Sequence, residues 1–187
     1  MHVLTLRGLR RSDALLLPDE GAIKPCTFLP PLTGTEDDLL DAMNTRELAE
    51  RLLEEGCNPS MYAIGSRGGA SDAFCLSHRD AQWQVCYTER GLDSPPIYAS
   101  GSESQACEFF FKYIMAMRHD HCVGFFKSQD NAVALEHELR ELGVISWSDQ
   151  IPYGGKHDPR YRVFVTGKEI FVAREALGEL PRRDTGA

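Results

Sequence analysis

Two histidines separated by one residue, His119 and His121, are the strongest hint of metal chemistry in this sequence. On a β-strand, residues two apart point to the same side, as the ligands of one metal ion can. No third ligand follows at a familiar spacing, although His137 and His157 could approach after folding. The pair also follows a long apolar segment that is typical of a helix, and histidines interact favourably with a helix C-terminus. The helix-end interpretation is favoured, and no metal or other cofactor is predicted.

Other residues with chemical potential point away from catalysis. Residues 65–71 are rich in glycine, but a P-loop needs Gly-Lys-Ser or Gly-Lys-Thr before a helix, whereas this stretch lies between two strand patterns. Cys75 and His78 would point to opposite faces of a strand, and no C-x-x-C pair occurs. No nucleophile elbow, H-E-x-x-H or Rossmann glycine pattern is present either. We therefore predict a protein that is not an enzyme, with buried reduced thiols rather than disulfides. The cysteines are Cys26, Cys57, Cys75, Cys86, Cys107 and Cys122.

Charge narrows the classes of partner. The chain has 187 residues, with 20 basic and 28 acidic side chains and a formal net charge of −8 at pH 7. Nucleic acids and anionic membranes require clustered Lys and Arg, so neither is a predicted partner. An acidic protein suits a basic protein partner, because complementary charge speeds encounter, although the same charge also serves solubility alone. No apolar run is long enough for a membrane span or a signal peptide, so a cytoplasmic location is expected.

Periodicity predicts an α+β fold with two parts. Asn44 followed by Glu47 indicates a helix N-terminus and Gly56 a helix end, so we expect a helix over residues 45–55 with an acidic outer face. A second helix opens at Ser102, and its broad apolar face, which includes Phe110, is expected to cover the sheet. Between the helices, strand patterns separated by turn-rich pieces predict an antiparallel meander. These patterns cover residues 61–65, 73–78, 83–88 and 96–100.

The second half predicts a β-α-β-β-α order. A strand at residues 122–127 precedes a helix that Ser128 caps and Gly143 ends. Two further strands flank a prominent turn at residues 152–160, and a short helix follows before a frayed tail from Pro181 on. The predicted organisation is an N-terminal arm at residues 1–35, a helix–sheet–helix part at 36–120, and the β-α-β-β-α half at 121–187. The last two parts are expected to pack as one globular unit.

Residues 61–111 resemble a stretch that recurs in bacterial immunity proteins, the neighbours of toxins that intoxicate rival cells. That stretch combines a Tyr-containing strand, a Trp strand that ends in Glu-Arg-Gly, and a helix that opens with Glu and Ala-Cys. The spacing before Ala-Cys is the local departure from that pattern. The matching residues are Tyr62, Trp83, Glu89, Arg90, Gly91, Glu103, Ala106 and Cys107. The resemblance covers about a third of the chain and extends to immunity factors of NAD-degrading toxins, which include type VI secretion effectors and toxins like the tuberculosis necrotizing toxin.

The resemblance implies an immunity protein that binds a cognate toxin and occludes its active site. No toxin-contacting residue follows from it, because the matching positions are typical of core and turn. Candidate contacts come instead from the acidic segment 37–55 and from two loops, which are equally consistent with variable turns of no function. Two alternatives remain open: a small Cys-dependent hydrolase, and a secretion chaperone or adaptor for an effector. The candidate contact residues are Asp37, Asp38, Asp41, Glu50, Glu54, Arg67, Tyr153, Lys156, His157 and Arg160.

Overall fold

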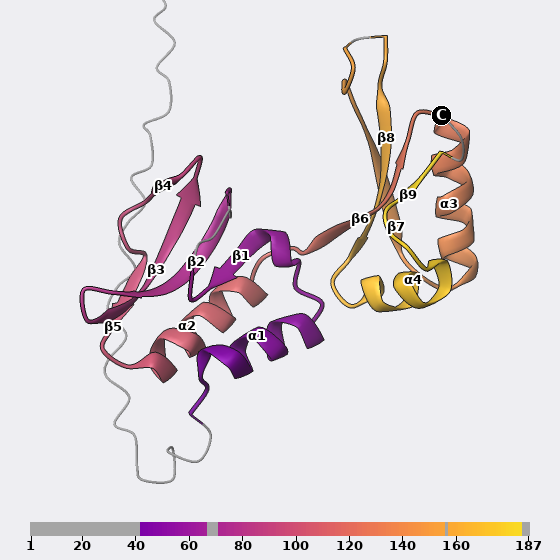
Figure 1. The fold of residues 1–187 in the computed structure, drawn as a ribbon. Coiled ribbons are helices and arrows are strands. Elements are labelled where there is room, and N and C mark those ends of the chain that lie inside the picture. The colour runs from indigo at the N-terminus through magenta and orange to yellow at the C-terminus, as the bar shows by residue number, and fades with distance from the viewer. Residues whose placement is uncertain (1–41, 67–70, 156, 185–187) are drawn as a thin grey trace, which may run out of the picture. The chain divides into compact units, whose positions relative to one another are not determined.

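The computed structural model describes residues 42–66, 71–155 and 157–184, which lie within one compact unit that spans residues 38–187. These residues form four α-helices, a short 3-10 helix and nine strands in two sheets, an α+β fold as predicted (Figure 1). The predicted arm at residues 1–35 lies outside the described residues. Among the described residues, no helix combines the length and the apolar character that crossing a bilayer requires.

Helix α1 (Thr45–Glu54) begins and ends where the sequence predicts. The Asn44 side chain accepts hydrogen bonds of 3.0 Å from the backbone N–H groups of Arg46 and Glu47, which satisfies two donors that the helix itself leaves unpaired. Gly56 follows the helix with a φ of +72°, a conformation that glycine adopts without steric cost.

The first sheet is built around a β-hairpin and has short strands beside it. It contains β1 (Tyr62–Ile64), which follows the 3-10 helix η2 (Pro59–Met61), then β2 (Ala73–Arg79), β3 (Gln82–Glu89), β4 (Leu92–Asp93) and β5 (Tyr98–Ser100). Two-residue loops with positive φ, at residues 80–81 and 90–91, join β2 to β3 and β3 to β4, as is typical of tight hairpins. The sheet differs from a simple meander in two ways. Strand β1 is parallel to β2, and β4 and β5 both pair with β3.

Helix α2 (Glu103–Met115) packs on the first sheet and forms the first of two cores. Its N-cap is Ser102, and Phe110 and Ile114 are fully buried. This core joins α2 to α1 and to the face of the sheet that carries Leu76 and Val85, whose Cα atoms are cross-strand partners. The prediction that the apolar face of this helix covers the sheet is confirmed.

The second half has its own sheet and its own core. Its elements are β6 (Asp120–Phe126), α3 (Gln129–Glu141), β7 (Ser146–Ile151), β8 (Arg160–Thr166), α4 (Glu169–Leu177) and β9 (Arg182–Arg183). The strand order is β7-β8-β6-β9, in which β9 is parallel to β6 and the other pairs are antiparallel. Helices α3 and α4 share a buried core with Val163 and Val165 of β8, so both lie on the same face of this sheet.

The predicted frayed tail is wrong for residues 181–184, which hold the start of α3. Strand β9 pairs with β6, and Arg182 forms an ion pair of 2.7 Å with Glu138 on α3. The Asp184 carboxylate accepts hydrogen bonds of 2.7 Å from the Lys127 N–H and from the Asn131 side chain. The predicted cap, Ser128, occupies the N-cap position but makes no side-chain capping bond. A carboxylate from the far end of the chain therefore binds the backbone just before α3 and a side chain of its first turn.

Candidate protein-binding face

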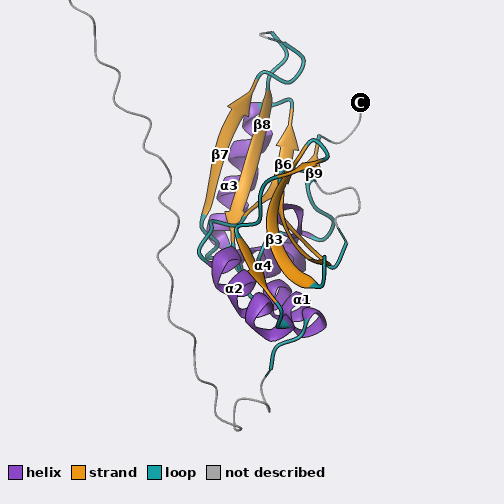
Figure 2. Cartoon of the chain, turned by 90° about the vertical axis from the view of Figure 1, so that its left-hand side faces the viewer, coloured by secondary structure: helices purple, strands orange, loops and turns teal. Residues whose placement is uncertain are grey.

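Strand β8 alternates between the helical core and the opposite face of the second sheet. Val163 and Val165 point toward α3 and α4, so Arg160, Arg162 and Phe164 point the other way. Figure 2 looks onto this opposite face of β7, β8 and β6, with α3 behind the strands. Side chains of β6, β7 and β9 join it through cross-strand pairing. We call it the arginine–aromatic face, and its members are Arg118, Phe125, Trp147, Asp149, Tyr153, Arg160, Arg162, Phe164 and Arg183.

The first stack on this face runs from Arg118 to Arg162. The Arg118 guanidinium lies 5.0 Å from the centre of the Trp147 ring. Trp147 stacks on Phe164 with ring centres 4.4 Å apart and 14° from parallel. The Arg162 guanidinium then lies 5.0 Å from the centre of the Phe164 ring. Two arginines therefore enclose two aromatic rings, and each contact adds a cation–π or ring–ring attraction to the cross-strand pairing.

A second stack repeats the same order with different residues. Arg183 lies 5.7 Å from the centre of the Phe125 ring, which meets the Tyr153 ring edge to face at 5.2 Å. Arg160 lies 5.0 Å from the centre of the Tyr153 ring. The Tyr153 side chain remains 64% exposed. Because the stack joins β6, β8, β9 and the β7–β8 loop, it ties the loop to the sheet.

Carboxylates hold three of the arginines in place. Arg162 makes a two-point contact with Asp149, and Arg160 makes one with Asp158. The Arg160 hydrogen bonds lower the pKa of Asp158. Arg118 donates to Asp120 at 2.9 Å. These charge-assisted contacts fix the direction of each guanidinium on its ring.

Asp120, at the edge of this face, accepts hydrogen bonds from three side chains. Its Oδ1 accepts hydrogen bonds from Arg118, from the Thr166 hydroxyl at 2.7 Å and from the Trp147 indole at 3.2 Å. Partial burial alone would raise the pKa of this carboxyl, but the three hydrogen bonds outweigh burial and lower it. Asp120 therefore stays ionised and orients the Trp147 ring.

The neighbouring histidines make hydrogen bonds at helix ends. His119 is buried, and its Nδ1 accepts the Asn58 N–H at 3.2 Å, so its Nε2 carries the proton and donates to the Ile114 carbonyl at 2.8 Å. His121 Nε2 lies 2.8 Å from the carbonyl oxygen of Gly56, at the end of α1. Among the described residues, no cluster of three or more His, Cys, Asp or Glu side chains could hold a metal ion.

Four of the described thiols are in surroundings that disfavour the thiolate. Burial raises the pKa of Cys57, Cys86, Cys107 and Cys122, and for Cys107 to about 12. A nucleophilic thiolate requires a shift in the opposite direction. Cys26 lies outside the described residues, as do residues 67–70 of the glycine-rich loop.

The structure brings together some of the predicted contact residues. Tyr153 and Arg160 meet in the second stack, and exposed His157 lies in the same β7–β8 loop. Arg160 is less exposed than the sequence suggested, because its ion pair and ring contact leave it only 8% exposed, and its contact with a toxin stays a prediction. Outside the described residues lie Asp37, Asp38, Asp41, Arg67 and Lys156.

Two of the acids on α1 are paired with arginines of the same helix. Glu50 pairs with Arg46 at 3.1 Å, and Glu47 pairs with Arg51 at 2.7 Å. Glu54 remains exposed on the same helix. Helix α1 belongs to the first half of the fold, so Glu50 and Glu54 are not part of the arginine–aromatic face. Of the described acids of α1, Glu54 is therefore the one without an ion pair to an arginine of the helix.

Sequence reasoning missed most of the arginine–aromatic face. Alternation along β8 was the available signal, because Arg160, Arg162 and Phe164 occupy every second position between apolar neighbours. The partners of these residues come from other strands and could be found only through register. The missed residues are Arg118, Phe125, Trp147, Asp149, Arg162, Phe164 and Arg183.

Comparisons with known proteins assign this fold and face to no family. No protein-family model, curated protein sequence or solved structure matches the chain.

Proposed function

We propose that this protein binds another protein through its arginine–aromatic face and that it serves as an immunity protein. The observation that carries the binding proposal is the pair of Arg–aromatic–aromatic–Arg stacks on the sheet face opposite α3 and α4. Trp, Tyr and Arg are the residue types that contribute most to protein–protein binding energy. The resemblance of residues 61–111 to immunity proteins supports a toxin as the partner.

Pre-ordering makes this face suited to tight binding. Long arginine side chains normally lose rotamer freedom when they are immobilised at an interface, at a cost of about 0.5–1.5 kcal/mol each. Here Arg160 and Arg162 are already fixed by Asp158 and Asp149, so much of that entropy is lost on folding and not on binding. The residual exposure of Tyr153 leaves an aromatic surface for the partner to cover.

The proposed action is steric inhibition in the bacterial cytoplasm. The protein would occupy the active-site cleft of one cognate toxin, with an NAD glycohydrolase effector as the proposed class. An interface of standard size would bury about 1,600 Å² in total. Inhibition of this kind needs no catalytic residue of its own, so it is consistent with thiols whose pKa is raised.

The test uses the purified protein, the product of the adjacent gene and two matched variants. Tyr153→Ala removes an exposed aromatic side chain from the proposed interface, and Phe171→Ala removes one from α4, on the opposite layer. We expect Tyr153→Ala to raise the Kd by about tenfold or more and Phe171→Ala to change it by less than about twofold.

Activity of the bound toxin separates inhibition from chaperoning. An immunity protein abolishes NAD hydrolysis by the toxin at stoichiometric ratio, whereas an adaptor leaves the bound toxin active. Failure of the wild-type protein to bind the adjacent gene product would overturn the immunity proposal. Equal effects of Tyr153→Ala and Phe171→Ala would overturn the assignment of the face.

A further inference from the structure

The two stacks contain four arginines, and three of them form an ion pair with an aspartate carboxylate. Arg118 pairs with Asp120, Arg160 with Asp158, and Arg162 with Asp149. Arg183 occupies the equivalent end of the second stack, over Phe125. In the described part of the chain, no ion pair to Arg183 is found. Three of the four arginines that end the stacks are therefore paired with a carboxylate of the described chain, and Arg183 is not.

The carboxylate nearest to Arg183 in sequence already accepts hydrogen bonds from other residues. Asp184 follows Arg183 directly, but both of its oxygens accept hydrogen bonds at the start of α3, from Lys127 and Asn131. The preceding residue, Arg182, points to the helical side of the sheet and pairs with Glu138. Strand β9 thus carries one arginine to each face, and only the one on the helical side has its counter-charge.

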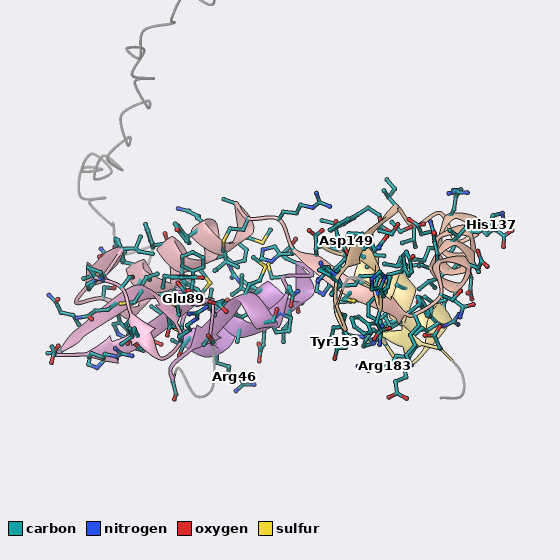
Figure 3. The ribbon with its side chains drawn as sticks, turned by 90° about the horizontal axis from the view of Figure 1, so that it is seen from above. Arg46, Glu89, His137, Asp149, Tyr153 and Arg183 are labelled. Carbon is teal, nitrogen blue, oxygen red and sulfur yellow. The ribbon has the colours of Figure 1, made fainter. Side chains whose placement is uncertain are left out.

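The position of Arg183 suits recognition of a carboxylate from outside. A guanidinium over an aromatic ring still has N–H donors along its edge, and these match the two oxygens of a carboxylate. Arg183 is exposed, and Phe125 connects it to the exposed ring of Tyr153. Figure 3 shows Tyr153 and Arg183 as labelled side chains of the second half. An incoming carboxylate would therefore lie beside an aromatic surface.

We infer that the partner bound by this face supplies the fourth carboxylate, from an Asp or Glu side chain that pairs with Arg183 beside Tyr153. This inference rests on the proposed protein-binding function and specifies the chemistry of the partner at one point. It differs from the expectation of a basic partner, which follows from the net charge of −8 alone. Charge complementarity is local at a contact: four guanidinium groups and three paired carboxylates leave an excess of one positive charge.

A carboxylate fits better than a phosphate on this face. Asp149, Asp158 and Asp120 are each neutralised by an arginine, so one positive charge is left for an incoming anion. A carboxylate brings one negative charge and balances it, whereas a phosphate brings close to two and leaves an unpaired negative charge at the contact.

The first experiment tests the chemistry without the toxin. The isotope-labelled full chain is titrated with a blocked Gly-Glu-Tyr-Glu-Gly peptide, and NMR records the arginine Nε–H signals. The controls are the twin peptide with Gln in place of Glu, and inorganic phosphate, at matched ionic strength. We expect the Arg183 signal to shift saturably with the Glu peptide and several times less with the Gln peptide. Equal shifts with both peptides, or a larger shift with phosphate, would overturn the inference.

The second experiment uses matched variants against the toxin. Arg183→Gln and Arg182→Gln remove the same charge from adjacent residues on opposite faces of β9. Melting temperatures establish that both variants fold. We expect Arg183→Gln to raise the Kd by about tenfold, or about 1.4 kcal/mol, and Arg182→Gln to leave it within about twofold.

The outcomes separate the two proposals. Toxin binding that Tyr153→Ala weakens and Arg183→Gln does not would keep the binding face and refute the fourth carboxylate. If the wild-type protein binds no toxin, the immunity proposal fails, and the peptide titration alone decides the chemistry of Arg183. A partner whose binding improves on loss of the Arg183 charge would show that the contact there is basic, against the inference.

Discussion

Asp184 holds the backbone just before α3 and Asn131 in its first turn, and its removal tests this non-local contact directly. Its carboxylate takes two hydrogen bonds of 2.7 Å, from the Lys127 N–H and from Asn131. Loss of an N-cap costs about 0.5–2 kcal/mol, and loss of the attraction between an anion and a helix N-terminus costs about 0.3–1 kcal/mol. We therefore expect Asp184→Ala to lower the free energy of unfolding by about 0.8–3 kcal/mol. Ser128→Ala should change it by less than about 0.5 kcal/mol, because Ser128 makes no capping bond.

Urea denaturation followed by circular dichroism measures both variants, and hydrogen exchange shows whether protection is lost in the first turn of α3. The pH dependence gives a second check. The hydrogen bond from the Lys127 N–H lowers the pKa of Asp184, so its contribution is present above about pH 4, the unfolded value, and is lost as pH falls below it. The difference between wild type and Asp184→Asn should shrink in acid. A larger loss of stability from Ser128→Ala than from Asp184→Ala would refute the reasoning and restore the local cap.

Three further changes test the packing of the first half and its contact with β6 and α4. Phe110→Ala should cost about 3–5 kcal/mol in urea denaturation, because the ring is fully buried against α1 and the sheet; a cost below about 1 kcal/mol would contradict that burial. Gly56→Ala should destabilise by more than about 1 kcal/mol, since its φ is +72° and a Cβ would lie 2.5 Å from the backbone carbon of Gly167; a neutral thermal melt would contradict this close approach. Burial lowers the pKa of His121, so stability should be full above about pH 6.5 and decline as pH falls through that value; His121→Gln should flatten this slope in urea titrations at several pH values, and an unchanged slope would assign it to other groups.

Local patterns were sufficient wherever a segment is stabilised by its own neighbours. The Asn44 cap, the Gly56 helix end and the apolar face of α2 depend on residues within a few positions of one another, and the structure confirms them. Strand β3 was also predictable from the alternation of Trp83 and Val85, which pack in the first core, but Cys86 and Thr88 on its other face are buried too, which alternation alone did not indicate. The α+β class followed from the order of these elements.

Features that depend on distant partners could not be predicted in the same way. Strands β4 and β9 have two residues each, too few for any periodicity, and β9 exists through pairing with Gly124 and Phe125, 58 residues earlier. The parallel pairing of β1 with β2 could not be predicted either, because alternation determines the face of a residue and not the direction of pairing. Most residues of the arginine–aromatic face could not be predicted for the same reason. Trp147 and Arg183 belong to the arginine–aromatic face through the register of β7 and β9.

The net charge and the Arg183 contact act at different distances, so kinetics can separate them. A charge of −8 creates a field that reaches a basic partner over about a Debye length, roughly 8 Å at physiological ionic strength, and it changes the association rate. A single desolvated ion pair acts only after contact and changes the dissociation rate. Replacing Arg183 with Gln makes the protein more negative overall, so a basic partner should associate no more slowly with the variant. We expect stopped-flow and surface-based measurements to show an association rate within about twofold of wild type and a dissociation rate about tenfold higher. If the variant slows association and leaves dissociation unchanged, Arg183 acts through the long-range field, and a paired carboxylate on the partner is excluded.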